Sequence, residues 1–220
     1  KRTERLKSIT MQLNKYEIPF EIQTAISPDD IASEAHARRT NSPPTGLFHE
    51  DTKLNFTIGK FKGIRQTELG CYQSHVQIMI KIAKSKTNDP VLVVEDDALL
   101  LPDFYNKTVR LMEKLPIDWE LFHVGYCYEP TCAERGPKTS EYCRHKPCLL
   151  YCTHAYFING SRVANLALDA LNTPIPSERL DAIFYKITEN YYASIPKLAK
   201  QVYKFGSDNG NGMGHWKNDQ

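Results

Sequence analysis

The stretch Val91-Leu92-Val93-Val94-Glu95-Asp96-Asp97 carries the strongest information about the fold. Its four aliphatic residues do not alternate with polar ones, which is typical of a strand covered on both faces in a parallel sheet. Three acidic residues follow directly at the carboxyl end of this strand. Because open parallel sheets bind ligands outside the carboxyl ends of their strands, the acidic run marks a candidate site.

Helices and strands are predicted to alternate on both sides of this stretch. The predicted helices cover residues 2–15, 67–83, 102–115 and 161–171, and a further helix capped by Ser177 carries Asp181. The other predicted strands cover residues 20–25, 119–124 and 155–158. Residues 27–66 form a polar segment interrupted by proline and glycine, expected to be irregular and functional. This order predicts one α/β domain over residues 1–220, with a mainly parallel sheet flanked by helices.

Composition narrows the possible partners. The 220 residues carry a net charge of +2 with both signs interspersed, so no basic stripe indicates nucleic acid. No apolar run approaches the roughly 20 residues that a transmembrane helix needs. The chain begins abruptly at Lys1-Arg2-Thr3-Glu4-Arg5, which is typical of the start of a helix. This indicates a fragment or a processed form that an upstream signal or anchor could precede.

Five of the six cysteines lie in a predicted Cys-rich insertion at about 127–152. Such clustering indicates disulfides in an oxidising compartment or a zinc site in the cytosol, and the absence of a Cys-x-x-Cys pair disfavours zinc. Asn-x-Ser/Thr sequons begin at Asn55, Asn106 and Asn159, the last where a strand meets a helix. We therefore expect the secretory pathway lumen (endoplasmic reticulum or Golgi) or secretion, with the bacterial cytoplasm as the alternative.

The acidic run has a functional and a structural interpretation. Clustered like charges raise each other's pKa, and a divalent cation relieves that repulsion. Carboxylate oxygens suit Mg²⁺ or Mn²⁺, which keep positions open for diphosphate oxygens. Along extended backbone Glu95 and Asp97 would point to one side and Asp96 to the other. The alternative is a solvated acidic turn that caps the next helix.

Three polar residues fall on the mostly apolar helix predicted at 67–83. Glu68, Ser74 and His75 converge on this buried element, which favours a functional site. The alternative for His75 is a core histidine whose hydrogen bonds are satisfied.

Four further residues are candidates from their chemistry. Asp181 could act as a general base or a metal-site partner, or be an ordinary first-turn helix acid. His215, in a glycine-rich tail, could reach a metal or stay exposed. Arg2 and Arg5 could bind phosphate or be solvated helix cations.

These features occur together in a known family. The sequence resembles glycosyltransferase family 25, which includes bacterial lipooligosaccharide galactosyltransferases and animal procollagen galactosyltransferases. The specific part is Glu68-Leu-Gly-Cys-Tyr-Gln-Ser-His75 followed by Val93-Val94-Glu95-Asp96-Asp97-Ala98. Supporting segments are Lys1-Arg2-Thr3-Glu4-Arg5-Leu6, Trp119-Glu-Leu-Phe-His-Val-Gly125, Thr153-His-Ala-Tyr-Phe-Ile158 and Leu180-Asp181.

The resemblance, which extends over about residues 1–195, implies a GT-A-type fold with a Rossmann-like sheet. It also implies a nucleotide-sugar donor, usually UDP-galactose, and Mn²⁺ that bridges acidic residues to the diphosphate. The family's first strand has no counterpart in this chain. Two other features depart from the family: Ala-Ile-Phe follows Asp181 where Glu-Phe/Tyr-Leu is common, and the cysteine cluster is not family-wide.

Together these observations predict a metal-dependent glycosyltransferase. It would move a sugar, galactose in the family, from a UDP-sugar to a hydroxyl of a glycan or protein acceptor, with inversion. Asp181 would be the catalytic base, and Asp97 the principal ligand of Mn²⁺ or Mg²⁺, with Glu95 and His215 as helpers. The predicted donor-binding residues are Arg2, Arg5, Glu68, Ser74, His75, Glu95 and Asp96. The alternatives are a non-catalytic sugar- or protein-binding homologue on the same scaffold, and a zinc module around Cys127–Cys152.

Overall fold

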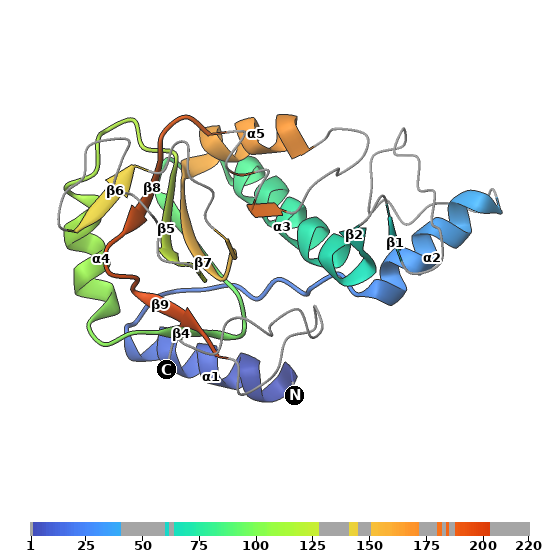
Figure 1. The fold of residues 1–220 in the computed structure, drawn as a ribbon, viewed down its shortest axis with the longest axis horizontal. Coiled ribbons are helices and arrows are strands. Elements are labelled where there is room, and N and C mark those ends of the chain that lie inside the picture. Colours follow the sequence, from blue (N-terminus) through green and yellow to red (C-terminus); the bar gives the residue numbers. More distant parts are fainter. Residues whose placement is uncertain are drawn as a thin grey trace.

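A mixed β-sheet with helices on both faces organises the structure (Figure 1). The computed structural model describes residues 2–40, 60–61, 64–127, 141–144, 151–171, 180–181, 184 and 188–202. The helices are α1 (Arg2–Lys15), α2 (Pro28–Arg39), α3 (Gln66–Ser85), α4 (Phe104–Met112) and α5 (Gly160–Leu171). The strands are β1 (Lys60–Phe61), β2 (Ile64–Arg65), β3 (Pro90–Val94), β4 (Ala98–Leu100), β5 (Leu121–Gly125), β6 (Tyr142–Arg144), β7 (Ala155–Asn159), β8 (Tyr191–Ser194) and β9 (Ala199–Gln201).

The main sheet has the order β3-β7-β5-β8-β6, and β9 pairs with both β4 and β5. β7 runs antiparallel to β3 and to β5, and the pairs β6–β8 and β4–β9 are also antiparallel. Among the described strands, the parallel pairs are β5–β8 and β5–β9. The expectation of a mainly parallel sheet is therefore wrong, whereas the α/β class with flanking helices is confirmed.

The apolar run of β3 misled the prediction for a physical reason. Val91 and Val93 face the core layer under α3, while Leu92 and Val94 face the opposite layer. A strand without alternation reports that both of its faces are covered, but not which way its neighbour runs. In the structure β3 lies at one end of the strand order. β5, all of whose residues are buried, lies in the interior of that order.

Two core layers, one on each face of the sheet, hold the helices in place. On one face, α3 contributes Leu69, Val76 and Met79 to a layer that includes Tyr156 of β7. On the other face, α1 and α4 pack with Phe122 of β5, and α1 also contacts β4 (Figure 1). The two layers give the sheet a face toward α3 and a face toward α4.

The elements predicted from periodicity are largely present. Helices at 2–15, 67–83 and 161–171 agree with α1, α3 and α5 within three residues, and α4 is shorter than predicted. None of the described helices is both long and apolar enough to cross a membrane. Ser177 and most of the insertion at 127–152 lie outside the described residues.

Two segments differ from the prediction. Residues 20–25 form no strand, because their side chains are exposed and no neighbouring strand pairs with them in the described ranges. Within the segment expected to be irregular, α2 begins at a capping box in which Ser27 accepts the Asp30 N–H and Asp30 accepts the Ser27 N–H. Few residues of α2 are buried and apolar, so periodicity did not reveal it, although Ser27 and Asp30 had the spacing of a cap.

Gly70 lets the segment before α2 pass close to α3. A Cβ atom on Gly70 would lie 2.5 Å from the carbonyl oxygen of Ile26. The N–H of Ile26 donates to Ser74 Oγ at 2.8 Å, and Ser74 Oγ donates to the Gly70 carbonyl oxygen at 2.7 Å. Gly70 and Ser74 together fasten this segment to the helix.

We expect Gly70→Ala to lower the free energy of unfolding by about 1–3 kcal/mol, because the new methyl group would overlap backbone that cannot move freely. This reverses the usual helix preference, in which alanine is favoured over glycine by about 1 kcal/mol. Urea unfolding would measure the change. Lys84→Ala, at an exposed position near the end of α3, is the control and should change stability by less than about 0.5 kcal/mol. A neutral or stabilising Gly70→Ala would contradict the close approach of Ile26.

Candidate active site

The acidic run lies where β3 ends and the chain turns into β4. The N–H of Ala98 donates to the Glu95 carbonyl oxygen at 3.1 Å, so residues 95–98 form a turn rather than continue the strand. The predicted alternation assumed extended backbone and is therefore wrong here. Glu95 is directed toward α3, and Asp97 toward α1 and β9. The carboxyl end of β3 meets the amino end of antiparallel β7 at this edge.

Glu95 joins three elements through one carboxylate oxygen. Its Oε1 accepts a hydrogen bond from Thr153 Oγ1 at 2.8 Å and lies 3.5 Å from Nε2 of His75 on α3. The other ring nitrogen of His75, Nδ1, is hydrogen-bonded to the Tyr156 hydroxyl at 2.7 Å. Burial alone would raise the pKa of Glu95, but the interactions with His75, His154 and Thr153 outweigh it and lower that pKa. Glu95 is therefore held as a carboxylate.

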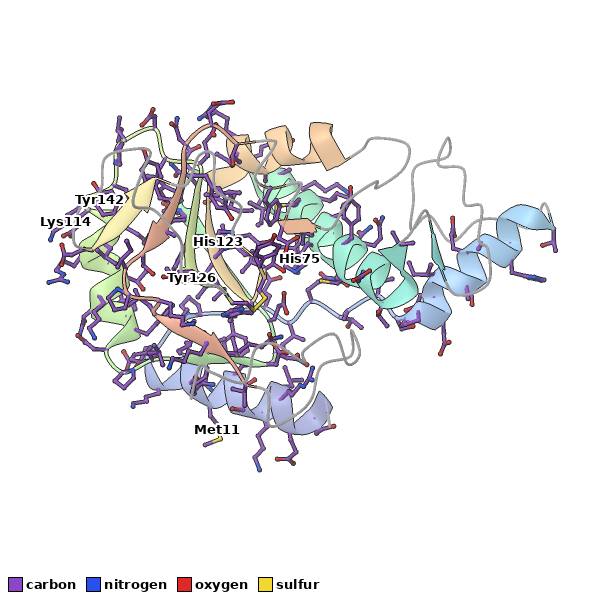
Figure 2. The ribbon with its side chains drawn as sticks, viewed as in Figure 1. Met11, His75, Lys114, His123, Tyr126 and Tyr142 are labelled. Carbon is purple, nitrogen blue, oxygen red and sulfur yellow. A yellow bond between two sulfur atoms is a disulfide. The ribbon has the colours of Figure 1, made fainter. Side chains whose placement is uncertain are left out.

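Aromatic rings in the layer between α3 and the sheet pack against this hydrogen-bond network. His75 stacks on Tyr156 with ring centroids 5.7 Å apart, and Tyr156 stacks on His123 at 5.3 Å. His123 meets the edge of Tyr191 at 5.0 Å. Figure 2 labels His75 and His123, whose side chains occupy the layer between α3 and the sheet. The packing limits movement of the His75 ring, so the position of Glu95 is set by the core.

Asp97 has the opposite electrostatic environment. Its Oδ2 accepts a hydrogen bond from Gln201 Nε2 at 3.0 Å and lies 3.8 Å from Arg5 NH1. Its Oδ1 is buried and has no hydrogen-bond partner among the described residues. Burial, followed by the charge of Glu95, raises the pKa of Asp97 to about 7, although Gln201 and Arg5 oppose the rise. A buried carboxylate oxygen of this kind is available to a cation.

Arg5 brings the first helix into the site. The residue is buried, and NH1 lies 3.6 Å from Asp96 Oδ1 and 3.8 Å from Asp97 Oδ2. The prediction placed Arg5 near phosphates, and the structure places it beside the acidic run. It therefore balances part of the negative charge there. Arg2 lies at the start of the same helix, and its side chain is outside the described residues.

Asp181 lies on the same side of the sheet as Glu95. Its Oδ2 accepts a hydrogen bond from the Cys152 N–H at 3.2 Å. Burial and the charges of Glu95, Asp181 and Asp97 together raise the pKa of the Cys71 thiol. Cys152 adjoins Thr153, whose hydroxyl donates to Glu95, so neighbouring residues of one segment hold Glu95 and Asp181, which lies 86 residues further along the chain.

The remaining predicted residues have different outcomes. Ser74 is engaged with Ile26 and Gly70, so the structure gives its hydroxyl a fastening function, and donor binding by Ser74 stays a prediction. Glu68 is half-buried in the first turn of α3, and its donor contact also stays a prediction. His215 lies outside the described residues.

Sequence reasoning missed several residues of the site, notably Thr153, Tyr156 and Gln201. Thr153 and Tyr156 belong to a segment recognised as a motif, but nothing in one sequence showed that they contact Glu95 and His75. Gln201 belongs to β9, a strand that was not predicted. Only the pairing of β9 with β4 brings its side chain to Asp97.

Two groups of described side chains have the ligand types and spacing for a metal. One is Cys71, His75 and Glu95, and the other is Cys127, Cys152 and His154. Cys127 and Cys152 are joined in a disulfide, which contradicts a zinc module built on these two thiolates and confirms that the insertion contains a disulfide. Neither group includes Asp97, so its candidacy rests on the buried Oδ1 and on its raised pKa.

Comparison with known proteins assigns most of the chain to one family. Residues 1–146 match the family described as glycosyltransferase family 25 (LPS biosynthesis protein). The matched part contains α1, α3 and the acidic run, and ends before Thr153 and Asp181. No curated protein gives a significant match.

We expect Asp97→Asn to stabilise the metal-free protein at pH 8. The folded-state pKa of about 7 lies above the ordinary aspartate value of 3.8, so wild-type stability decreases as the pH rises from about 4 to 7. Removing the ionisable group eliminates this loss of folding free energy. A shift of about three pKa units corresponds to at most about 4 kcal/mol. The gain should be large at pH 8 and small at pH 4, as measured by urea unfolding with a chelator.

Asp96→Asn is the matched control. The Asp96 side chain is 38% exposed and shares Arg5, so its replacement should change stability little and with weak dependence on pH. If Asp97→Asn instead destabilised the protein at pH 8, the ion pair with Arg5 would outweigh the cost of burying the Asp97 charge. The charge would then be favourable, contrary to the prediction.

Proposed function

Because this chain belongs to glycosyltransferase family 25, we propose that it transfers a sugar from a nucleotide-sugar donor, with UDP-galactose the first candidate, to a hydroxyl of a glycan or protein acceptor. The GT-A-type arrangement, the metal and the inverting course are parts of this proposal. The observation that supports it beyond family membership is that the adjacent residues Cys152 and Thr153 hold Asp181 and Glu95, while the turn after Glu95 presents the buried carboxylate oxygen of Asp97.

The carboxylate oxygens at this edge of the sheet suit a hard divalent cation. Asp97 has a buried carboxylate oxygen with no hydrogen-bond partner in the described part of the chain, and its charge is unfavourable even with Arg5 nearby. We propose that Asp97 holds Mn²⁺ or Mg²⁺, with Asp96 or Glu95 beside it and His215 completing the set. When bound, the cation would neutralise charge on the departing diphosphate.

Arg5 and Glu95 would position the donor. Arg5, fixed between Asp96 and Asp97, offers guanidinium N–H groups to phosphate oxygens near the same edge. Glu95 is held through Thr153 and His75, so it anchors the turn that presents Asp97. Because these contacts exist before a ligand arrives, little reorganisation would be needed on binding.

Asp181 would accept the proton of the acceptor hydroxyl. In a single displacement the acceptor oxygen bonds to the anomeric carbon while the sugar–phosphate bond breaks, and the nucleoside diphosphate leaves with the bonding electrons. The Cys152 N–H, donating to Oδ2, would fix the orientation of the carboxylate. A positioned base typically contributes about 10²–10⁴-fold to the rate.

The compartment is part of the proposal as well. Disulfides persist in oxidising compartments and are rare in the cytosol. The Cys127–Cys152 disulfide therefore supports the secretory pathway lumen or secretion over the bacterial cytoplasm.

The first test is a donor screen that measures transfer and hydrolysis of UDP- and GDP-sugars with Mn²⁺. We expect wild-type activity to fall with a chelator and to be lost in Asp97→Asn. Calorimetry should show that UDP binds wild type in the presence of Mn²⁺. If neither UDP nor Mn²⁺ binds the folded protein, the chain is a non-catalytic member of the family and the proposal fails.

Metal binding has its own readout. A cation that binds only the folded state at 100 times its Kd stabilises that state by about 2.7 kcal/mol. Mn²⁺ should therefore raise the Tm of wild type and leave the Tm of Asp97→Asn unchanged. An equal rise in the Tm of both proteins would show that the metal binds without Asp97.

Asp181→Asn tests the base separately from the metal. The amide keeps an oxygen that can accept the Cys152 N–H but has no basic carboxylate, so the fold and donor binding should persist. We expect kcat to fall about 10²–10⁴-fold with little change in the KM for donor. Full activity of this variant would exclude Asp181 as the base while leaving the metal assignment intact.

A further inference from the structure

We propose that Asn106 carries an N-linked glycan on the outer face of α4, and that the sequon beginning at Asn159 does not. The inference rests on the proposed passage through the secretory pathway, but not on glycosyltransferase activity. Its evidence comes from the exposure of Asn106, from the surface beside it, and from an unusual buried hydroxyl at Thr108.

Asn106 has the surroundings that a glycan needs. Its side chain is exposed in the first turn of α4, where Nδ2 donates to Asp103 Oδ1 at 2.7 Å. A glycosylated amide nitrogen keeps one N–H, so this hydrogen bond is compatible with the modification. The attached sugar would project from the helix into solvent.

Exposed apolar side chains flank Asn106. Tyr105 is 47% exposed and precedes it directly, and Val109 is 42% exposed one helical turn later on the same side. Large apolar side chains gain by removal from water. The sugar nearest the protein would cover part of this surface, which otherwise stays in contact with water.

Thr108, the third residue of the sequon, lies in the core. It is 3% exposed and shares the buried face of α4 with Phe104 and Leu111. Its Oγ1 has no hydrogen-bond partner among the described residues. A hydroxyl buried in this way destabilises a fold, and valine would fill nearly the same volume without one. A sequon requires the hydroxyl, which gives a reason for threonine at a position where packing favours valine.

The sequon at Asn159 has the opposite environment. Asn159 ends β7, where it pairs with Pro90 of β3, and its Nδ2 donates to the Trp119 carbonyl oxygen at 2.7 Å. The Asn159 N–H also donates to the Glu120 carbonyl oxygen at 3.1 Å. A glycan attached here before folding would prevent β7 from packing against the start of β5, so chains that fold and are secreted should carry none at Asn159. Asn55 lies outside the described residues.

The glycan would not obstruct the proposed active site. α4 packs on the face of the sheet opposite α3, as the two core layers show (Figure 1). His75 and Glu95 lie on the α3 side of the sheet, and Asp97 contacts Arg5 of α1 and Gln201 of β9 rather than α4. Modification of Asn106 is thus compatible with binding of donor and acceptor.

The group transfer requires a donor that the cell supplies, an oligosaccharide linked through diphosphate to a polyisoprenoid lipid. The Asn106 amide nitrogen forms a bond to the anomeric carbon of the first sugar and loses one proton. The bond between that carbon and the phosphate oxygen breaks, and the lipid diphosphate leaves with the electron pair. The transfer precedes folding of α4, so the later burial of Thr108 does not prevent it.

The experiment expresses the full chain behind a cleavable secretion signal in a eukaryotic cell. Peptides from the secreted protein are treated with a glycosidase in heavy-oxygen water, which converts each formerly glycosylated asparagine to labelled aspartate. We expect label at Asn106 and none at Asn159. Asn106→Gln and Thr108→Val should each remove the label at residue 106, and Thr108→Ser, which keeps the sequon, should retain it.

A second measurement tests the account of Thr108 without any glycan. In protein made in bacteria and oxidised, Thr108→Val should raise the Tm by a few degrees, because it removes a buried unsatisfied hydroxyl. An unlabelled Asn106 in the secreted wild type, label at Asn159, or a lower Tm for Thr108→Val would each overturn the proposal. Donor transfer measured on secreted Asn106→Gln separates this outcome from the proposed function, since that variant should keep wild-type activity.

Discussion

The hydrogen-bonded contact of the Glu95 carboxylate with Thr153 and His75 is the interaction on which the rest of the site depends. It connects the end of β3, the approach to β7 and the middle of α3 through a single oxygen atom. A carboxylate in such a partly buried place is stable only when its hydrogen bonds are made, and here they also lower its pKa. The hydrogen bond between His75 and Tyr156 transmits this constraint into the aromatic layer of the core.

Two carboxylates only two residues apart therefore have opposite properties. Glu95 is satisfied by neutral and basic neighbours, whereas Asp97 is raised to a pKa of about 7 by burial and by the Glu95 charge. The turn at Ala98 produces this difference, because it directs the two side chains to different neighbours. One carboxylate stabilises the local structure, and the other keeps a buried oxygen available to a ligand. A buried, unfavourable charge of this kind is typical of functional sites, where ligand binding is favoured at some cost in folding stability.

The sequence was sufficient for features that depend on local patterns. Helical spacing predicted α1 and α3, and the position of Glu95-Asp96-Asp97 after an apolar run marked the candidate site. Features that depend on distant pairing were not predictable. The direction of β7 relative to β3, and the approach of Gln201 to Asp97, follow from strand pairs separated by many residues. Ser74 had the chemistry of a ligand, but the crossing of Ile26 over Gly70 engages its hydroxyl.

Asp181 shows how the second half of the chain contributes to the candidate site beside Glu95. The carboxylate accepts the N–H of Cys152, a residue with φ of 73°, a backbone conformation that residues other than glycine rarely adopt. The disulfide ties Cys152 to Cys127, just beyond β5, and the N–H of Cys127 donates to the carbonyl oxygen of Tyr151 at 3.1 Å. The cross-link therefore limits the ways in which the chain can enter β7. Thr153 follows immediately and donates to Glu95, so the same short segment holds two carboxylates, Asp181 and Glu95. This explains how residues outside the matched family segment can belong to one site with residues inside it.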